Sequence, residues 1–481
     1  MSAHDADGAD GAEADVVVVG GGGAGLAAAV AAAEAGSSVL LFEAERELGG
    51  STALSAGMLT AAGTAVQREL GIDDSAERFF QHYMDLNQWL LKPGLVRTFC
   101  EQAGPAVEWL IGLGVRIPAR ISHDAHTPGL TRAGVEDVWR GHVPADQGYG
   151  VVQVLDRARR RLGVEVVLNT RVERLLVEQG RVCGVVADGV EVRAGAVVVT
   201  TGGLAHDADL RRRHYPAADR SGEDLFVVAA PGARGDHLRL GAQVRAAVAG
   251  DGWGLLLPTA YFQRMHHWQS GFPPVSRVVV NGTGRRFMDE DASYAVSSGL
   301  IDAQPGPVWM VFDETARVGL PPGYAHWSAE HVEAEAAAGR TVRAGSVGEL
   351  ATAIGVPPAA LAATLDRWNA GLPATGSDPD FLRHRSLAAK SAAPRPDPVA
   401  RPPFYAARFL PAELVCTHAG LEIDEHAAVL DDSGVVVPGL FAAGEAGAGV
   451  LGARYVGGGN AVANAVTMGR VAGRSAARPP C

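Results

Sequence analysis

Two glycine-rich segments at opposite ends of the chain constrain its fold most strongly. Residues 438–473 read as a short apolar strand, a Gly-Glu turn, a loop with glycines around a tyrosine, and a helix. Residues 16–30 read as an apolar strand that passes through four glycines into a second helix. A strand that leads through glycines into a helix is typical of a dinucleotide-binding unit. Together the segments predict a chain that folds back on itself so that both ends hold one dinucleotide.

The first segment has the spacing Gly-x-Gly-x-x-Gly at Gly20, Gly22 and Gly25, after the strand and at the start of the helix. The first glycine permits the tight turn, the second lets the backbone reach a pyrophosphate, and the third lets the helix pack on the strand. The helix N-terminus then faces the phosphate charge. Glu43 ends the next strand, where its carboxylate can accept hydrogen bonds from both ribose hydroxyls. These features in register predict dinucleotide binding.

The second segment favours FAD over NAD. The strand at 440–443 runs into Gly444 and Glu445, and this acid can hold the ribityl chain of a flavin. Asn460 starts a helix whose N–H groups can face the flavin and stabilise negative charge on the reduced ring. A domain that binds only NAD does not need this element. The alternative is a glycine-rich loop and a buried helix with no ligand. A second Gly-x-Gly-x-x-Gly segment is missing from the sequence, so we expect an external electron acceptor.

The composition limits the class of protein. The 481 residues are 47% hydrophobic and 20% charged, as in a soluble globular protein with two or three domains. The net charge of −12 argues against a nucleic-acid partner. The four cysteines form no Cys-x-x-Cys pair, which fits the reducing cytoplasm. Residues 1–14 are acidic and predict a disordered tail, and the most apolar segment, 25–33, is too short for an integral membrane segment.

The pattern along the chain predicts an FAD-binding domain formed by residues 15–254 and 405–481, with a cap or substrate domain inserted at 255–404. Within the first domain we expect Trp89 and Trp109 to lie in the core of a helical region. The expected strands and hairpin are 16–19, 39–42, 164–168, 171–193 and 196–199, and the expected helical segments are 24–35, 73–115, 150–162, 328–338, 346–354 and 358–370.

Several further motifs resemble the fumarate reductase/succinate dehydrogenase flavoprotein superfamily, over nearly the whole chain. They are GGST at 49–52, SAG at 55–57, NTRVERL around Val172, TTGG at 200–203, Gly235-Asp236, NGTGRRFMDE at 281–290, and the C-terminal segment. The resemblance implies an α/β fold, a Rossmann-like FAD-binding domain of the glutathione-reductase type with an inserted α+β cap domain. It implies chemistry at flavin N5. Residues 49–58 contain no histidine, which predicts non-covalent FAD. The additional cofactor-binding residues implied are Gly50, Ser51, Thr52, Gly57, Val172, Gly202, Asp236 and Val462.

The chain departs from fumarate-type members where they hold a dicarboxylate with histidines and arginines. Leu257 and Cys416 occupy the places of the two histidines, and no arginine follows Glu290 in the expected segment. Arg454 matches one family arginine, out of register with the glycines that follow. So few positively charged side chains could not offset the cost of removing two substrate carboxylates from water. The sequence therefore argues against fumarate or succinate as the substrate.

The replacements resemble 3-ketosteroid dehydrogenases of the same superfamily. These carry a tyrosine soon after the RFxxE segment, matched by Tyr294, and a Tyr-x-Gly-x-Gly loop, matched at Tyr455–Gly459. The resemblance implies that the Tyr455 hydroxyl and the Gly459 N–H bind a ketone oxygen, and that Tyr294 removes the α-proton. The alternative is that both tyrosines only pack, half-buried. A tyrosine base needs help, for which Arg285, Arg286 or a hydrogen-bonded relay are candidates.

The sequence thus predicts an FAD-dependent dehydrogenase, a CH–CH oxidoreductase that forms a C=C bond next to a carbonyl by α-proton abstraction and hydride transfer to flavin N5. The expected small-molecule substrate is largely apolar and cyclic, either steroid-like or a secondary metabolite. The alternatives are an ene-reductase of the fumarate-reductase type that acts on an unsaturated acid or enone, and a non-catalytic flavin-holding or redox-sensing protein. His266 and His267 are candidates to line the substrate pocket, and His418 to approach the flavin. No metal site is expected, because no acidic residue stands near the two adjacent histidines in the sequence.

Overall fold

The computed structural model describes residues 12–122, 127–132, 136–375, 378–383 and 395–477. Most of the predicted acidic tail, residues 1–11, lies outside this part, and residues 12–14 begin the first strand. The helices are α1 (Gly23–Glu34), α2 (Gly50–Leu54), α3 (Ala65–Glu69), α4 (Ala76–Leu86), α5 (Pro93–Leu113), α6 (Gln147–Arg161), α7 (Ala208–His214), α8 (Asp236–Ala242), α9 (His267–Ser270), α10 (Tyr294–Asp302), α11 (Glu314–Val318), α12 (Ala329–Ala337), α13 (Val347–Ile354), α14 (Pro358–Thr375) and α16 (Asn460–Ala476), with the short 3-10 helices η1 (Pro216–Asp224) and η2 (Gly444–Ala446).

The larger sheet is mostly parallel and forms the nucleotide-binding half. Its strands lie in the order β18 (Ala428–Leu430), β19 (Val436–Ala442), β9 (Val190–Val199), β1 (Ala12–Val19), β2 (Val39–Phe42) and β6 (Glu165–Val167), and β8 (Arg181–Ala187) joins β9 to β7 (Val172–Glu178). The central strands are valine-rich because both faces of a parallel sheet are covered. Val17 pairs with Leu40 on one side and with Val197 on the other.

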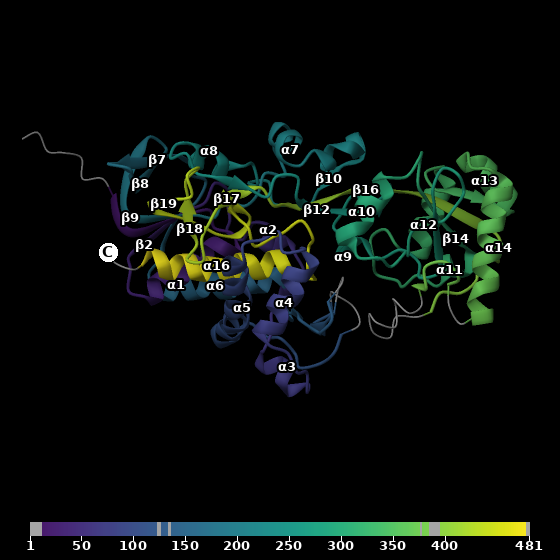
Figure 1. Cartoon of the computed structure of the whole chain (residues 1–481), viewed down its shortest axis with the longest axis horizontal. Helices are drawn as coiled ribbons and strands as arrows, with labels where there is room; N and C mark the ends of the chain where they lie inside the picture. Colours follow the sequence, from purple (N-terminus) through teal and green to yellow (C-terminus); the bar gives the residue numbers. More distant parts are fainter. Residues whose placement is uncertain (1–11, 123–126, 133–135, 376–377, 384–394, 478–481) are drawn as a thin grey trace, which may run out of the picture.

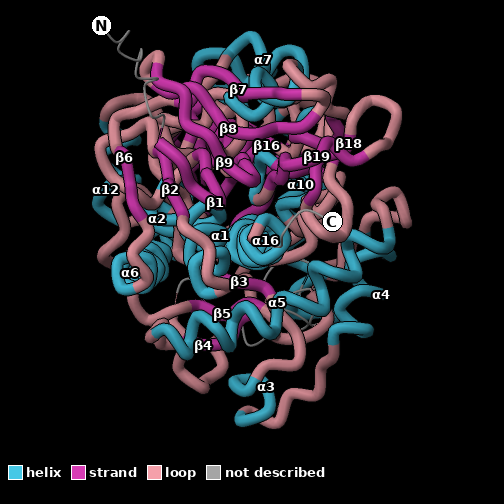
Figure 2. The backbone as a smooth tube through the Cα atoms, turned by 90° about the vertical axis from the view of Figure 1, so that its left-hand side faces the viewer, coloured by secondary structure: helices cyan, strands magenta, loops and turns pink. Residues whose placement is uncertain are grey.

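Helices α1, α16 and α6 cover one face of this sheet, where Figure 2 shows α1 and α16 side by side. Small residues permit this contact: a Cβ at Gly469 or Gly473 would lie 2.3 or 2.1 Å from the carbonyl oxygens of Ala24 and Ala28. The two glycine-rich ends of the chain therefore meet, as the sequence predicted.

The second sheet lies in the other half of the molecule (Figure 1). It contains β10 (Phe226–Val227), β12 (Gly254–Ala260), β13 (Arg277–Val280), β14 (Trp309–Asp313), β15 (Val342–Ala344) and the long strand β16 (Phe404–Thr417). The remaining strands form two small sheets: β11 (Val248–Ala249) with β17 (Gly420–Glu422) and β20 (Gly447–Ala448), and β3 (Leu59–Thr60) with β5 (Gly141–Val143) and β4 (Gly129–Thr131). The antiparallel pair β12 and β16 runs from the second half toward the first.

The predicted fold class is confirmed, and one detail is wrong. The helical region at 73–115 is two helices, because Gln88 and Trp89 have left-handed φ angles of 53° and 57° that end α4. Trp89 is consequently 50% exposed instead of buried in the core. Trp109 packs partly buried against the core and donates a hydrogen bond to Glu34 at 3.0 Å. None of the helices in the described ranges is both long and apolar enough to cross a membrane.

Candidate active site

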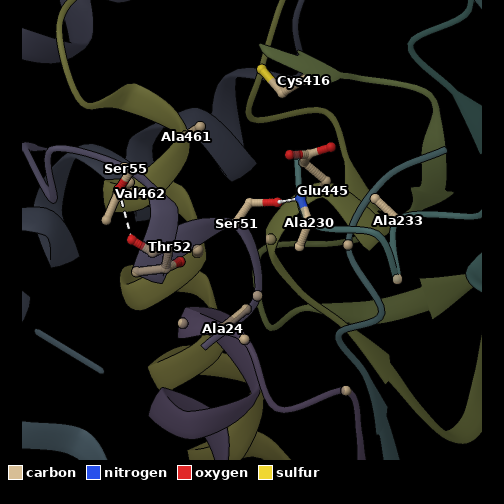
Figure 3. A pocket seen from close by; sticks show the side chains of 18 of the residues that line it. Ala24, Ser51, Thr52, Ser55, Ala230, Ala233, Cys416, Glu445, Ala461 and Val462 are labelled. Atoms are coloured by element: carbon tan, nitrogen blue, oxygen red, sulfur yellow. Dashed lines mark hydrogen bonds between the residues drawn. The ribbon is translucent and has the colours of Figure 1, made fainter. Parts of the chain in front are cut away.

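One large cavity brings together most of the residues that the sequence singled out. Residues from both sheets form its wall, and Figure 3 shows labelled side chains from α1, α2 and the N-terminus of α16 around it. The predicted residues along it are Gly20, Gly22, Glu43, Gly50, Ser51, Thr52, Gly57, Val172, Gly202, Asp236, Gly444, Glu445, Val462, Tyr294, Tyr455 and Gly459. Gly25 and Asn460 do not line it.

The β1–α1 turn forms one end of the cavity. Gly20 has a φ of +103°, and a Cβ there would lie 2.6 Å from the carbonyl oxygen of Thr200. A Cβ at Gly22 would meet nothing closer than 3.9 Å, so this glycine leaves open space in the cavity wall. A Cβ at Gly25 would lie 1.8 Å from the Gly20 oxygen, which is the helix-packing position predicted for the third glycine.

Glu43 is held in place beside this turn. Its carboxylate accepts hydrogen bonds from the N–H groups of Gly21 at 2.6 Å and Glu45 at 2.9 Å. Burial raises the pKa of Glu43, although both hydrogen bonds oppose this shift. The acid at the end of β2 is thus buried, oriented and part of the cavity wall.

The residues from the family motifs lie along the same wall. The Ser51 hydroxyl accepts a hydrogen bond from the Ala230 N–H at 2.9 Å (Figure 3). Arg171 lies beside Val172 and forms ion pairs with Asp236. Glu445, which Figure 3 shows beside Ser51 and Ala230, accepts a long hydrogen bond from the Thr417 N–H at 3.4 Å, and burial raises its pKa to about 7.

The loop before α16 fixes the hydroxyl of Tyr455. The Ala461 N–H, in the first turn of α16, donates a hydrogen bond to the Tyr455 oxygen at 2.7 Å. Burial raises the pKa of Tyr455 well above its usual range, so the phenol stays protonated. Gly459 caps α16 with a φ of +84°, and a Cβ there would lie 2.3 Å from the carbonyl oxygen of Met58. A tyrosine that accepts one N–H directs its own proton to another acceptor.

Asn460 starts α16, as predicted, and its side chain points away from the cavity lining. It is fully buried, and its side-chain amide donates to the Tyr83 hydroxyl at 2.9 Å. Tyr83 in turn donates to the carbonyl oxygen of Val450 at 2.7 Å. The side chain therefore joins α16 to α4, while the N–H of Ala461 is used by Tyr455.

Tyr294 lies at the start of α10, with its ring centroid 6.0 Å from that of Tyr455. Burial, and then the charge of Glu136, raise the pKa of Tyr294. The arginines considered as helpers do not line the cavity: Arg286 is ion-paired with Glu290 and Asp378, and Arg285 is exposed. Glu136 could not be predicted from the sequence, because it lies 158 residues before Tyr294 in the chain and belongs to no motif.

The ring of His418 lies next to the ring of Tyr455. Its ring centroid is 6.3 Å from that of Tyr455, and its Nδ1 forms a hydrogen bond with the carbonyl oxygen of Gly452 at 3.0 Å. Burial lowers the pKa of His418 to about 4, so this imidazole is neutral near pH 7. His418 does not line the cavity, whereas its neighbour Cys416 does.

His266 and His267 line the same cavity, as predicted. The expectation that no acidic residue stands near them is wrong. Glu413 of β16 is fully buried, and its Oε1 lies 3.4 Å from Nδ1 of His266 and 3.3 Å from Nδ1 of His267. The three side chains have the atom spacing of a metal site. Their proximity depends on the pairing of β12 with β16, which sequence spacing does not reveal.

Comparison with known proteins gives consistent matches. The family model for the FAD binding domain matches residues 15–462. The fumarate reductase (cytochrome) of Shewanella frigidimarina is 31% identical over 475 residues, 96% of this chain and 77% of its own. The 3-oxosteroid 1-dehydrogenase of Mycobacterium tuberculosis is 29% identical over 394 residues, 72% of this chain and 67% of its own.

A solved structure gives a similar result for the fold. The 3-ketosteroid-Δ4-(5α)-dehydrogenase of Rhodococcus jostii RHA1, in complex with 4-androstene-3,17-dione, superposes with a TM-score of 0.81 at 28% identity. The match covers 97% of each chain. The likeness therefore extends through the second sheet as well as the first.

Proposed function

Because the chain belongs to the FAD binding domain family and is an FAD-dependent oxidoreductase acting on CH–CH groups, we propose that it desaturates a carbon–carbon bond next to a ketone. The proposed substrate is largely apolar and cyclic. The observation that carries this proposal is the hydrogen bond from the Ala461 N–H to the Tyr455 hydroxyl, which leaves a protonated phenol fixed in the cavity wall.

The residues along the cavity fit FAD. Glu43 supplies a buried carboxylate for ribose hydroxyls, and the open space at Gly22 lies where α1 begins, which suits a pyrophosphate. Glu445 supplies a second carboxylate for the ribityl chain, and α16 begins at the same wall. When bound, FAD supplies the acceptor for a hydride. Non-covalent attachment remains a prediction.

Tyr455 and Gly459 have the proposed task of binding the ketone oxygen. Loss of an α-proton builds negative charge on that oxygen, so donors fixed beforehand lower the barrier. The Tyr455 hydroxyl is held by Ala461, and Gly459 is held by its left-handed conformation at the start of α16. Both residues line the cavity, so both can contact a bound ligand.

Tyr294 has the proposed task of accepting the α-proton. Its raised pKa makes a free phenolate unfavourable near pH 7, so the proton needs a further acceptor. We propose Glu136 for this step, since its charge acts on Tyr294 and since a Cβ at Gly457 would lie 2.3 Å from its carboxylate. Glu136 thus contacts the same loop that carries Tyr455.

The remaining wall near the tyrosines supports an apolar substrate. Leu255 and Leu257 of β12 and Cys416 of β16 line it, at or beside the places where fumarate-type members carry histidines. Among the described residues that line the cavity, the arginine is Arg171, and its charge is already neutralised by an ion pair with Asp236. This wall suits a hydrocarbon skeleton with one carbonyl.

Anaerobic mixing of the FAD-loaded protein with candidate ketones tests the proposal. A substrate should bleach the flavin absorbance near 450 nm, and mass spectrometry should find a product two hydrogens lighter. Oxidation of the dithionite-reduced protein by enones, but no bleaching by any saturated ketone, would contradict the proposed direction. That outcome would favour an ene-reductase, a second candidate that the 31% identity to a fumarate reductase supports.

A further inference from the structure

Arg383 is a buried arginine that does not line the cavity of the proposed site. Its side chain is 0% exposed. The guanidinium donates hydrogen bonds to the carbonyl oxygens of Val275 at 2.7 Å and Arg277 at 2.9 Å, at the start of β13. Its Nε also donates to a carboxylate oxygen of Asp291. Because the N–H groups of a guanidinium lie in one plane, a single arginine can hold these three acceptors in a fixed arrangement.

Asp291 is held at both of its carboxylate oxygens. Arg383 binds Oδ2, and Nη2 of Arg277 donates to Oδ1 at 2.9 Å. The same Nη2 donates to the carbonyl oxygen of Glu290 at 2.7 Å. The side chain of Asp291 is only 14% exposed, so little water competes for these bonds. The backbone at this point is therefore tied both to β13 and to a residue 92 positions away in the chain.

Glu290 connects the same point to the other end of the segment 378–383. Its carboxylate accepts hydrogen bonds from Arg286 at 2.8 and 2.6 Å. Arg286 also donates to Asp378 at 2.5 and 2.9 Å. Asp378 in turn accepts two backbone N–H groups of its own segment, at 3.0 and 3.1 Å. Two neighbouring acids thus fasten the two ends of one short segment.

Tyr294 follows this anchored point in the chain. Helix α10 begins at Tyr294, three residues after Asp291. Three residues span at most about 11 Å even when fully extended, so the chain has little slack between them. The turn that follows Asp291 is closed by the Ala292 N–H, which donates to the carbonyl oxygen of Asp289 at 3.0 Å. A displacement of Asp291 would therefore be passed on to the ring of Tyr294.

The ketone-binding side of the proposed site has a different support. Tyr455 is held by the Ala461 N–H, and Gly459 by its conformation before α16. These supports involve neither Asp291 nor Arg383. Loss of the anchor should consequently disturb the proton step and leave ketone binding intact.

We propose that Arg383 is a positioning residue for the proton step, which orients Tyr294 toward the substrate by fixing Asp291. The inference rests on the proposed function of Tyr294 as the acceptor of the α-proton. Arg383 does not touch the ligand and acts through Asp291 and the first turn of α10. The segment 378–383 thereby becomes part of the catalytic apparatus although Arg383 lies outside the cavity wall.

The test measures anaerobic flavin reduction in the FAD-loaded full chain. The probe is 4-androstene-3,17-dione or, if this steroid does not reduce the flavin, the ketone that reduces it fastest in the screen described above. The dependence of the reduction rate on ketone concentration gives a limiting rate and a Kd. Exchange of the α-proton with D₂O reports the proton step separately. FAD content and the melting temperature report correct folding.

Arg383→Met and Asp291→Asn should each lower the limiting rate and the exchange rate about tenfold or more, because small misplacements of a reacting group are costly. The Kd for the ketone should stay within about twofold. Arg383→Lys keeps a positive charge beside Asp291 and should recover part of the rate. The double variant Arg383→Met/Asp291→Asn should be no more than about twofold slower than the slower single variant, because both changes break one link.

Arg317→Met is the matched control. The side chain of Arg317 is 14% exposed, is paired with Glu314 and donates to the carbonyl oxygen of Ala329 at 2.8 Å. It has no bond to the segment before α10 among those of the described residues, so its loss should change the limiting rate by less than about twofold.

Three outcomes would overturn the inference. Limiting rates that stay unchanged in folded Arg383→Lys and Asp291→Asn would do so, and so would an equal loss in Arg317→Met. Losses that multiply in the double variant would show that Arg383 does not act through Asp291. Tyr294→Phe, measured in parallel, separates this inference from the proposed function. An unchanged rate in Tyr294→Phe would contradict the proposed base itself, whereas a loss confined to Tyr294→Phe would contradict only the role of Arg383.

Discussion

The backbone N–H of Ala461 donates a 2.7 Å hydrogen bond to the hydroxyl oxygen of Tyr455, which ties the phenol to the first turn of α16. The bond explains why a tyrosine in a glycine-rich loop can be precisely oriented. It also occupies an N–H group that would otherwise face a ligand at this helix N-terminus. Orientation and protonation of Tyr455 thus have separate causes, the Ala461 N–H and burial.

Removal of the Tyr455 hydroxyl tests its role directly. Tyr455→Phe should lower turnover by about 10²–10³, the scale for losing one oxyanion donor. The amount of bound FAD should not change, because the Tyr455 hydroxyl is separate from Glu43 and Glu445, the two carboxylates proposed to hold the cofactor. Tyr149→Phe, at a side chain that is 61% exposed, is the control. Turnover of Tyr455→Phe within about threefold of the control would remove this residue from the mechanism.

The proton step makes a separate prediction for Tyr294. Tyr294→Phe should abolish exchange of the substrate α-proton with D₂O, measured by mass spectrometry on the recovered ketone. Glu136→Gln should slow the same exchange, because the proton then lacks its acceptor, while ligand binding persists. If both variants exchange at the rate of the unmodified protein, the base lies elsewhere.

Two glycines of the β1–α1 turn should separate cofactor binding from folding. Gly22→Ala places a methyl group in open cavity space, so the melting temperature of the FAD-free protein should be nearly unchanged. FAD affinity should fall about 5- to 150-fold, from an overpacking cost of about 1–3 kcal/mol. Gly25→Ala would clash with the Gly20 carbonyl and should destabilise the protein even without FAD. Unchanged FAD affinity in Gly22→Ala would contradict the assignment of this wall.

Gly459, before α16, and Gly434, between β18 and β19, both have a left-handed conformation and give a matched pair of substitutions. Gly459 and Gly434 have φ angles of +84° and +78°, so alanine should cost about 1–2 kcal/mol at either position. At Gly459 the new Cβ would also meet the Met58 carbonyl at 2.3 Å, whereas at Gly434 it meets nothing within 4 Å. Gly459→Ala should therefore lower stability further in thermal unfolding, and it alone should reduce turnover. Equal effects of the two substitutions would contradict this.

Burial of Glu445 predicts a pH effect on the FAD-free protein. Its pKa rises from 4.5 to about 7 on folding, so between these values the folded protein holds a proton that the unfolded chain has lost. The free energy of unfolding must then fall as pH rises through this window, by at most about 3 kcal/mol.

Denaturant titrations at pH 5 and pH 8 measure this effect. Glu445→Gln cannot titrate, so its stability relative to the unmodified protein should increase from pH 5 to pH 8. Glu425→Gln, at an exposed position, should show no such increase. A constant difference between Glu445→Gln and the unmodified protein across this range would show that Glu445 is solvated.

The sequence by itself determined the features that depend on local spacing. The glycines at 20, 22 and 25 and the acid at 43 define a βαβ unit because strand and helix periods repeat within a few residues. The same holds for the strand and turn at Gly444 and for the tyrosine spacing before α16. The two ends of the chain could be paired from their shared pattern, and the structure brings α1 and α16 together.

The tertiary structure alone decided which side chains meet across long separations. Asn460 starts α16 as the sequence predicted, but only the structure shows that its side chain bonds to Tyr83, 377 residues away. Glu413 reaches His267 across 146 residues through the register of β12 and β16. Sheet register and helix packing are set by the whole core. A local sequence pattern therefore predicts which residues form a strand, but it does not predict which distant buried charged residue contacts them.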